Sequence, residues 1–135
     1  MIVMKEHICT TLEQARELAK FLDSENADMY WQDIGGAVIP TFELIGTPPF
    51  PKDSITPCWS LDALLRLLPE VVRKDDVYYS IAFFKECGKW TILYEEAPVG
   101  DDLPKYYDNL IEQTSENFLD AAYNVIIELH NKELL

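Results

Sequence analysis

The amino-acid sequence predicts an α+β protein, in which a small antiparallel sheet has about three helices packed on it. Three observations carry this prediction. Segments near residues 10–23, 60–68 and 115–130 repeat apolar side chains at the three- and four-residue spacing of an amphipathic helix. Residues 77–95 instead show the two-residue alternation of strands on either side of a glycine-containing turn, which is typical of a β-hairpin. The proline-rich stretch 46–57 is expected to be irregular.

The first helix has two alternative capping boxes at its start. Thr10 with Glu13, or Thr11 with Gln14, has the spacing at which two side chains satisfy the free backbone N–H groups of a helix. One face of this helix is apolar and consists of Ile8, Leu12, Ala15, Leu18, Ala19 and Leu22. The polar residues 23–26 are expected to end it.

Extended segments follow the first helix. Residues 27–32 are predicted to be extended and partly buried, and residues 33–36 to form a turn. A second extended stretch is predicted at 37–44, where Pro40 confines it to a sheet edge because proline donates no hydrogen bond. Residues 46–57 are predicted to form a stiff loop that wraps over a single domain, with a linker between two domains as the alternative.

The second helix has clear start and stop signals. Ser60 is the expected N-cap, and Trp59 before it with Leu64 after it has the spacing of a hydrophobic staple. Pro69 ends this helix early. The hairpin follows, and its turn is expected at residues 85–89.

The C-terminal part is predicted to end in the longest helix. Residues 109–112 fit either a third short strand or a helix. Ser115 is the expected N-cap of the last helix, with Glu116 in the first turn. The apolar face of this helix consists of Phe118, Leu119, Ala122, Val125, Ile126 and Leu129.

Composition excludes several classes of protein. The chain has 135 residues, 48% of them hydrophobic, which predicts one domain spanning 1–135 with a real core rather than a disordered tail. A net charge of −13, from 24 acidic and 11 basic residues, argues against direct binding to nucleic acid or to an anionic membrane. The apolar run at the N-terminus is only four residues long, too short for a signal peptide, so we expect a cytoplasmic protein.

No arrangement of residues predicts catalysis, and we expect no catalytic residue, no metal ligand and no cofactor. His7 and His130 lie at opposite ends of the chain, without a Cys, His or carboxylate at ligand spacing. Cys9, Cys58 and Cys87 are far apart in sequence, which predicts three ordinary reduced thiols. The glycines lack the Lys and Ser or Thr of a phosphate-binding loop.

Two sets of residues are candidates for binding a partner. Residues 95–120 hold eight acidic residues and one basic residue, a net charge of −7, and predict an acidic face that includes Glu95, Glu96, Asp101, Asp102, Asp108 and Glu112. Aromatic side chains are also numerous for this length, and those predicted to be exposed contacts are Tyr30, Trp31, Phe50, Tyr106 and Tyr107. The alternative without a binding role is that the acidic segment is merely solvated and that the aromatic rings belong to the core.

Three stretches carry a resemblance to a family. They are Ile8-Cys9-Thr10-Thr11 with Ala27-Asp28-Met29-Tyr30-Trp31, then Trp59-Ser60-Leu61-Asp62-Ala63-Leu64-Leu65 with Leu68-Pro69, and then Leu119-Asp120-Ala121-Ala122. With these stretches the chain resembles short uncharacterised proteins of phages and mobile elements of gut Bacteroidales. The resemblance spans most of the chain, implies a small cytoplasmic protein, and supplies no catalytic residues. A weaker analogy, of layout alone, is to HicB-type antitoxins.

These observations predict a non-enzymatic protein that takes part in protein–protein interaction or regulation for a phage or mobile element. The expected partner is a protein, with a basic protein as one option, and a homodimer through the hairpin edge or an exposed ring cluster is another. One alternative is a DNA mimic that inhibits a host DNA-binding protein. Another is a small-molecule-binding or enzymatic role, which would require a deep pocket with convergent polar groups.

Overall fold

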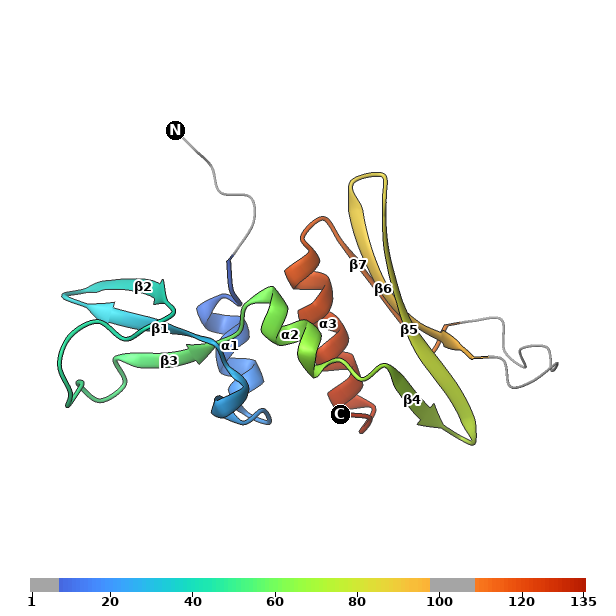
Figure 1. Ribbon diagram of the computed structural model, residues 1–135, viewed down its shortest axis with the longest axis horizontal. Coiled ribbons are helices and arrows are strands. Elements are labelled where there is room, and N and C mark those ends of the chain that lie inside the picture. The colour runs from blue at the N-terminus through green and yellow to red at the C-terminus, as the bar shows by residue number, and fades with distance from the viewer. Residues whose placement is uncertain (1–7, 98–108) are drawn as a thin grey trace. The chain divides into compact units, whose positions relative to one another are not determined.

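A computed structural model describes residues 8–97 and 109–135 and confirms the α+β fold class. These residues form three α-helices and two antiparallel sheets, of three and four strands, where the sequence predicted one sheet. The chain divides into two compact units, Met1–Leu65 and Arg66–Leu135, and the boundary falls within the second helix (Figure 1). Each unit contains one sheet, and each is described separately.

Helix α1 (Leu12–Ala19) begins with the second of the two predicted capping boxes. The Gln14 backbone N–H donates to Thr11 Oγ1 at 3.1 Å, and the Thr11 backbone N–H donates to Gln14 Oε1 at 2.9 Å. Ala15 and Leu18 are the fully buried residues of its apolar face. A single 3-10 turn, η1 (Ser24–Asn26), follows where the helix was expected to end.

The sheet of this first unit contains β1 (Met29–Ile34), β2 (Ala37–Thr41) and β3 (Ile55–Cys58) in the order β2-β1-β3. Pro40 lies in the edge strand β2, as predicted. The prediction of an irregular stretch over all of 46–57 was wrong, because its last residues form β3. Strand β3 tolerates Pro57 because β3 is the other edge of the sheet.

The loop between β2 and β3 is fixed by one buried amide. The Gln32 side chain, only 3% exposed, donates through Nε2 to the Ile45 carbonyl and accepts through Oε1 from the Ile45 N–H, both at 2.8 Å. The strands on both sides of the loop pair with β1. The loop therefore connects two strands of one sheet and does not link the two units.

We expect Gln32→Ala to release this loop. The variant leaves both Ile45 backbone groups without their partner, at a cost of about 1–3 kcal/mol for two hydrogen bonds. Urea unfolding should report this loss, and hydrogen exchange should show a faster Ile45 amide. The exposed Glu43 lies in the same loop and supplies the control Glu43→Ala. An unchanged exchange rate at Ile45 in Gln32→Ala would contradict the anchoring role.

Helix α2 (Leu61–Leu67) begins where its signals predicted. The Ala63 backbone N–H donates to Ser60 Oγ at 3.2 Å, and the Leu64 N–H donates to the Ser60 carbonyl at 3.0 Å. Trp59 and Leu64, the predicted staple residues, are both fully buried. The side chain of Ser60 thus satisfies a helix N–H that would otherwise lack an acceptor.

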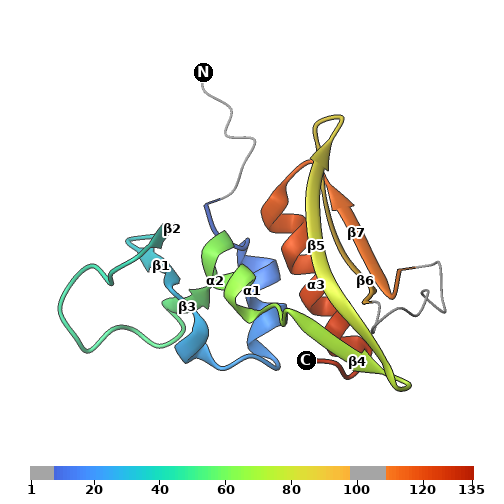
Figure 2. The ribbon, with the colours of Figure 1, turned by 45° about the vertical axis from the view of Figure 1, so that its right-hand side comes forward.

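The second unit contains a four-stranded sheet in the order β4-β5-β6-β7 (Figure 2). Its strands are β4 (Val71–Lys74), β5 (Val77–Glu86), β6 (Lys89–Glu96) and β7 (Ile111–Ser115). The β5–β6 hairpin is confirmed, but its turn contains only Cys87 and Gly88, since both strands extend further than expected. Strand β4 was not predicted. Residues 109–112 were expected to form either a strand or a helix, and β7 shows that their second half is a strand.

Helix α3 (Phe118–Asn131) packs on β6 and β7. Its N-cap is Asn117 and not Ser115, which ends β7 and accepts from the Asn117 N–H instead. The Asn117 side chain accepts from the Leu119 N–H at 2.9 Å, so the helix starts two residues later than predicted. The buried side chains of the helix are Leu119, Ala121, Ala122, Val125, Ile126 and Leu129.

Candidate functional site

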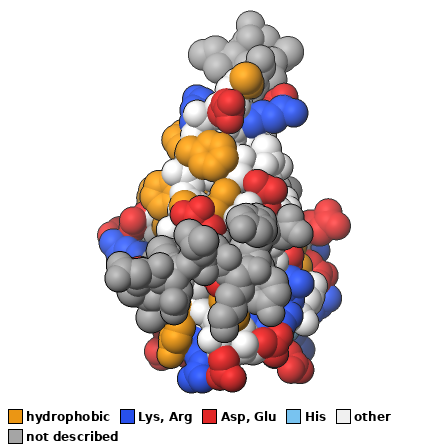
Figure 3. Space-filling model, turned by 90° about the vertical axis from the view of Figure 1, so that its right-hand side faces the viewer, with side chains coloured by type: hydrophobic (Ala, Val, Ile, Leu, Met, Phe, Trp, Pro, Cys, Tyr) orange, Lys and Arg blue, Asp and Glu red, His pale blue; other side chains and the backbone are white. Residues whose placement is uncertain are grey.

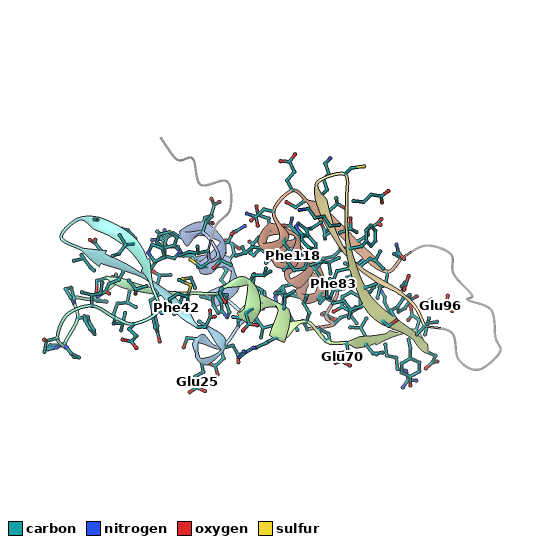
Figure 4. The ribbon with its side chains drawn as sticks, turned by 45° about the horizontal axis from the view of Figure 1, so that its top comes forward. Glu25, Phe42, Glu70, Phe83, Glu96 and Phe118 are labelled. Atoms are coloured by element: carbon teal, nitrogen blue, oxygen red, sulfur yellow. The ribbon has the colours of Figure 1, made fainter. Side chains whose placement is uncertain are left out.

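The strand register of the second sheet separates its side chains into two faces. Directly opposed residues of an antiparallel pair point to the same face, and successive residues point to opposite faces. Phe83 and Trp90 lie on the face toward α3, because both rings contact Phe118, with centroids 5.8 and 4.3 Å away (Figure 4). Gln113 lies on it too, since its Nε2 donates to Glu128 Oε1 of α3 at 2.9 Å. The opposite face, called the outer face below, faces away from the helix.

The core beneath this sheet is held by a hydrogen-bonded tyrosine. Tyr94 is fully buried on the α3 side, and its hydroxyl donates to the Pro69 carbonyl at 2.7 Å. Burial raises the pKa of Tyr94 above its ordinary value, so this hydroxyl remains a protonated donor. The bond ties β6 to the chain just before β4 and fixes the strands that carry the outer face.

The outer face exposes several large apolar side chains. Val71, Tyr78 and Phe84 are 51%, 44% and 43% exposed and come from β4 and β5. Beside Phe84, Thr91 Oγ1 and Thr114 Oγ1 are 2.8 Å apart and share a hydrogen bond between β6 and β7. Figure 3 views this unit from the side away from α3 and shows apolar side chains gathered among acidic and basic ones.

Two of the predicted acidic residues lie on the outer face. Glu95 is opposite Ser80 of β5, and Glu112 is opposite the buried Leu93 of β6. The two glutamates are therefore diagonal neighbours on adjacent strands, roughly 7–8 Å apart by the usual geometry of antiparallel sheets. Both are exposed, and within the described residues neither forms an ion pair with a Lys or Arg.

Basic side chains of the second sheet lie at its two ends. Arg73 on β4 forms an ion pair with Asp76, and its guanidinium lies 5.6 Å from the centre of the Tyr78 ring. On the α3 face, the Lys85 ammonium lies 5.4 Å from the centre of the Trp90 ring. The middle of the outer face therefore carries the two glutamates beside apolar side chains, which gives it a negative charge.

The remaining predicted residues are not brought together there. Glu96 pairs with Tyr79 and lies on the α3 face. Tyr30, Trp31 and Phe50 belong to the first unit and are half-buried, and the Trp31 indole N–H donates to the Thr10 carbonyl at 2.8 Å. Five other predicted residues lie outside the described residues, namely Asp101, Asp102, Asp108, Tyr106 and Tyr107.

Sequence reasoning missed Tyr78 and Phe84 as candidate contacts. Their signal was the two-residue alternation of the hairpin, which places residues 78, 80, 82 and 84 on one face. The alternation alone did not show which face α3 covers, because both faces carry apolar side chains.

Strand β5 also has a partly unpaired edge. Strand β4 pairs with β5 only as far as Ser80, and the Ile81 N–H donates to the Glu70 carbonyl just beyond. Residues 82–86 pair with β6 on one side, and on their other side no strand of the described chain lies against them. A homodimer through the hairpin edge, one of the options that the sequence leaves open, would have to form along this segment.

Across residues 8–97 and 109–135, no three His, Cys, Asp or Glu side chains gather in a way that suits a metal ion. None of the helices in the described ranges has the length and apolar character needed to cross a membrane. No protein-family model, curated protein or solved structure matches this chain.

Proposed function

We propose that the chain is a non-enzymatic interaction protein that binds a basic protein segment through the outer face of its four-stranded sheet. The observation that carries this proposal is the placement of Glu95 and Glu112 on one exposed face with Tyr78 and Phe84. Aromatic rings supply large contact areas at low entropic cost, and they are enriched among the residues that dominate binding energy. That the chain serves a phage or mobile element rests on the sequence resemblance alone.

The charge of the face favours a partner with Lys or Arg side chains. Neither glutamate has a described cation within ion-pair distance, so a basic partner would supply the missing counter-charge. Exposed ion pairs contribute about 0.2–1 kcal/mol each, so they bias the choice of partner and the association rate more than they set affinity. The apolar side chains therefore have to supply most of the binding energy.

A DNA mimic is the second candidate, and the diagonal spacing of the two glutamates is the observation in its favour. A mimic needs its carboxylates to continue as a ridge that follows the phosphate positions of DNA. The discriminating result is competition, because a mimic and DNA would displace each other from the same DNA-binding protein.

Charge reversal at the two glutamates tests the interaction proposal. Peptides selected from a random displayed library on the folded chain should be rich in Lys or Arg combined with apolar residues. We expect Glu95→Lys/Glu112→Lys to weaken their binding by roughly 5–30-fold, since two attractive contacts become repulsive. Isothermal titration measures this change, and amide NMR shifts should fall on β5, β6 and β7.

The matched control is Glu116→Lys/Glu133→Lys, which changes the net charge equally at two exposed residues outside the strands. Its binding should stay within about twofold of the parent chain. An equal loss in both double variants, selected peptides without basic residues, or NMR shifts confined to the first unit would overturn the proposal. A homodimer formed through the outer face is the remaining outcome that would overturn the proposal, because the face would then bind a second copy of the chain. Analytical ultracentrifugation of the chain alone would show such a dimer.

A further inference from the structure

Two cysteines that are 49 residues apart in sequence meet in the first unit. Cys9 pairs with Ser60 in an isolated antiparallel bridge, and Cys58 is the last residue of β3. Between them, the Thr10 N–H donates to the Trp59 carbonyl at 2.8 Å, and the Trp59 N–H donates to Thr10 Oγ1 at 3.1 Å. Cys9 and Cys58 are therefore diagonal neighbours on one face of this two-chain ladder.

The two thiol groups lie close to each other. They share a side-chain hydrogen bond, and both residues are buried, with Cys9 2% and Cys58 0% exposed. The hydrogen bond lowers the pKa of Cys9, although burial and the Asp28 carboxylate oppose it. The same bond, together with burial, raises the pKa of Cys58. Cys9 is thus the thiol that ionises first, and Cys58 holds the remaining proton.

Hydrogen bonds hold the backbone on both sides of the pair. Asp28 accepts from the Ser60 backbone N–H at 2.8 Å and from the Ser60 hydroxyl, which fixes the residue opposite Cys9. The Trp31 indole N–H donates to the Thr10 carbonyl at 2.8 Å and holds the residue after Cys9. Diagonal neighbours of an antiparallel ladder lie roughly 7–8 Å apart. The Cα atoms of a disulfide are usually about 4.4–6.8 Å apart, so the two backbones have to shift slightly toward each other as the bond forms.

We propose that Cys9 and Cys58 are a dithiol site that forms a reversible intramolecular disulfide by exchange with a low-molecular-weight disulfide, of which oxidised glutathione is the probe. The Cys9 thiolate attacks one sulfur of the glutathione disulfide and releases one glutathione thiolate, which takes up a proton. Cys58 then gives its proton to solvent and attacks the Cys9 sulfur, which releases the second glutathione. Two electrons and two protons thus pass from the protein thiols to glutathione.

Burial of the pair determines how the exchange proceeds. Cys9 lies close to the described N-terminal end of the chain, beside the exposed Ile8, and a single bridge pairs it with Ser60. Local opening at that bridge has to precede attack, so the exchange is slow and has to be followed to equilibrium. Once formed, the disulfide closes a loop that holds α1, β1, β2 and most of β3, which restricts the unfolded chain.

The test uses the full chain with Cys87→Ser, because Cys87 is exposed in the turn of the β5–β6 hairpin and would react separately. The protein is brought to equilibrium in glutathione redox buffers of graded potential. Its free thiols are then alkylated, and the mass of the protein is measured by mass spectrometry. We expect a monomer lighter by two hydrogen atoms, with Cys9 linked to Cys58 in the peptide map, and return to the dithiol in dithiothreitol. The oxidised form should melt higher, by on the order of 10 °C.

Two further variants make the outcome decisive. In the Cys87→Ser background, Cys9→Ser and Cys58→Ser should each form at most a mixed disulfide with glutathione. A Cys87→Ser chain that keeps both thiols at every potential would overturn the proposal, as would one that yields only mixed or intermolecular disulfides. If Cys87→Ser does not fold, peptide mapping of the oxidised parent chain decides whether Cys9 is joined to Cys58 or to Cys87.

Discussion

Replacement of Trp59 by alanine should have the largest effect on stability, a loss of about 3–5 kcal/mol. Trp59 is the largest fully buried side chain described, and it lies between β3 and α2. Its backbone N–H and carbonyl are both bonded to Thr10, so the backbone has little freedom to close the cavity that alanine would leave. Urea unfolding followed by far-UV circular dichroism should show the midpoint fall.

Trp59→Phe is the control that separates packing from polarity. The Trp59 Nε1 atom is buried and has no hydrogen-bond partner among the described residues, so the indole N–H adds nothing favourable to the folded state. Phenylalanine keeps an aromatic ring and removes this donor, and its cost should be below about 2 kcal/mol. Equal losses in the alanine and phenylalanine variants would show that the indole N–H does have a partner.

Ile126→Ala should produce the second largest effect, a loss of about 2–5 kcal/mol. Ile126 is fully buried on the apolar face of α3, which packs on β6 and β7. The cavity left by alanine would lie against the sheet that carries the outer face. Thermal unfolding measures the loss, and Asn124→Ala, at an exposed residue of the same helix, should stay within about 0.5 kcal/mol of the parent.

The Trp59 and Ile126 variants together also test the domain prediction. Trp59 lies in Met1–Leu65 and Ile126 in Arg66–Leu135. A single domain predicts one transition that both variants lower together at every probe. Independent units predict two transitions, each lowered by one variant, which residue-resolved hydrogen exchange would separate. The single domain inferred from length stays a prediction until that measurement.

The helices and the hairpin could be predicted from the sequence because their signals are local. The Thr11–Gln14 capping box and the cap at Ser60 act over three or four residues, and both occur where expected. Strand β3 was missed because its short run of Ile55 and Thr56 is surrounded by prolines. Ser115 was chosen as a cap because serine suits that position, but pairing with Trp90 kept Ser115 in β7. Long-range pairing decided both cases.

The candidate sites depended even more on long-range pairing. Glu95 and Glu112 were predicted from charge density, but only the strand register shows that they share a face and that Glu96 lies on the other. Cys9, Cys58 and Cys87 were predicted to be ordinary reduced thiols because their distance in sequence was the only measure available. The proximity of Cys9 and Cys58 comes from the bridge between Cys9 and Ser60, which no local pattern indicates.

The partly unpaired edge of β5 has a consequence for motion along the hairpin. Tyr79 and Ser80 pair with strands on both sides, and Tyr78 pairs with β4 while its carbonyl accepts from the Ala97 N–H. Residues 82–86 pair with β6 alone. Backbone groups with fewer partners open at lower free energy, so amide exchange should quicken from Tyr79 toward Glu86. Phe84 lies on the faster half and Tyr78 on the slower half of the same strand. The outer face would therefore offer a partner one fixed ring and one that can adjust as it binds.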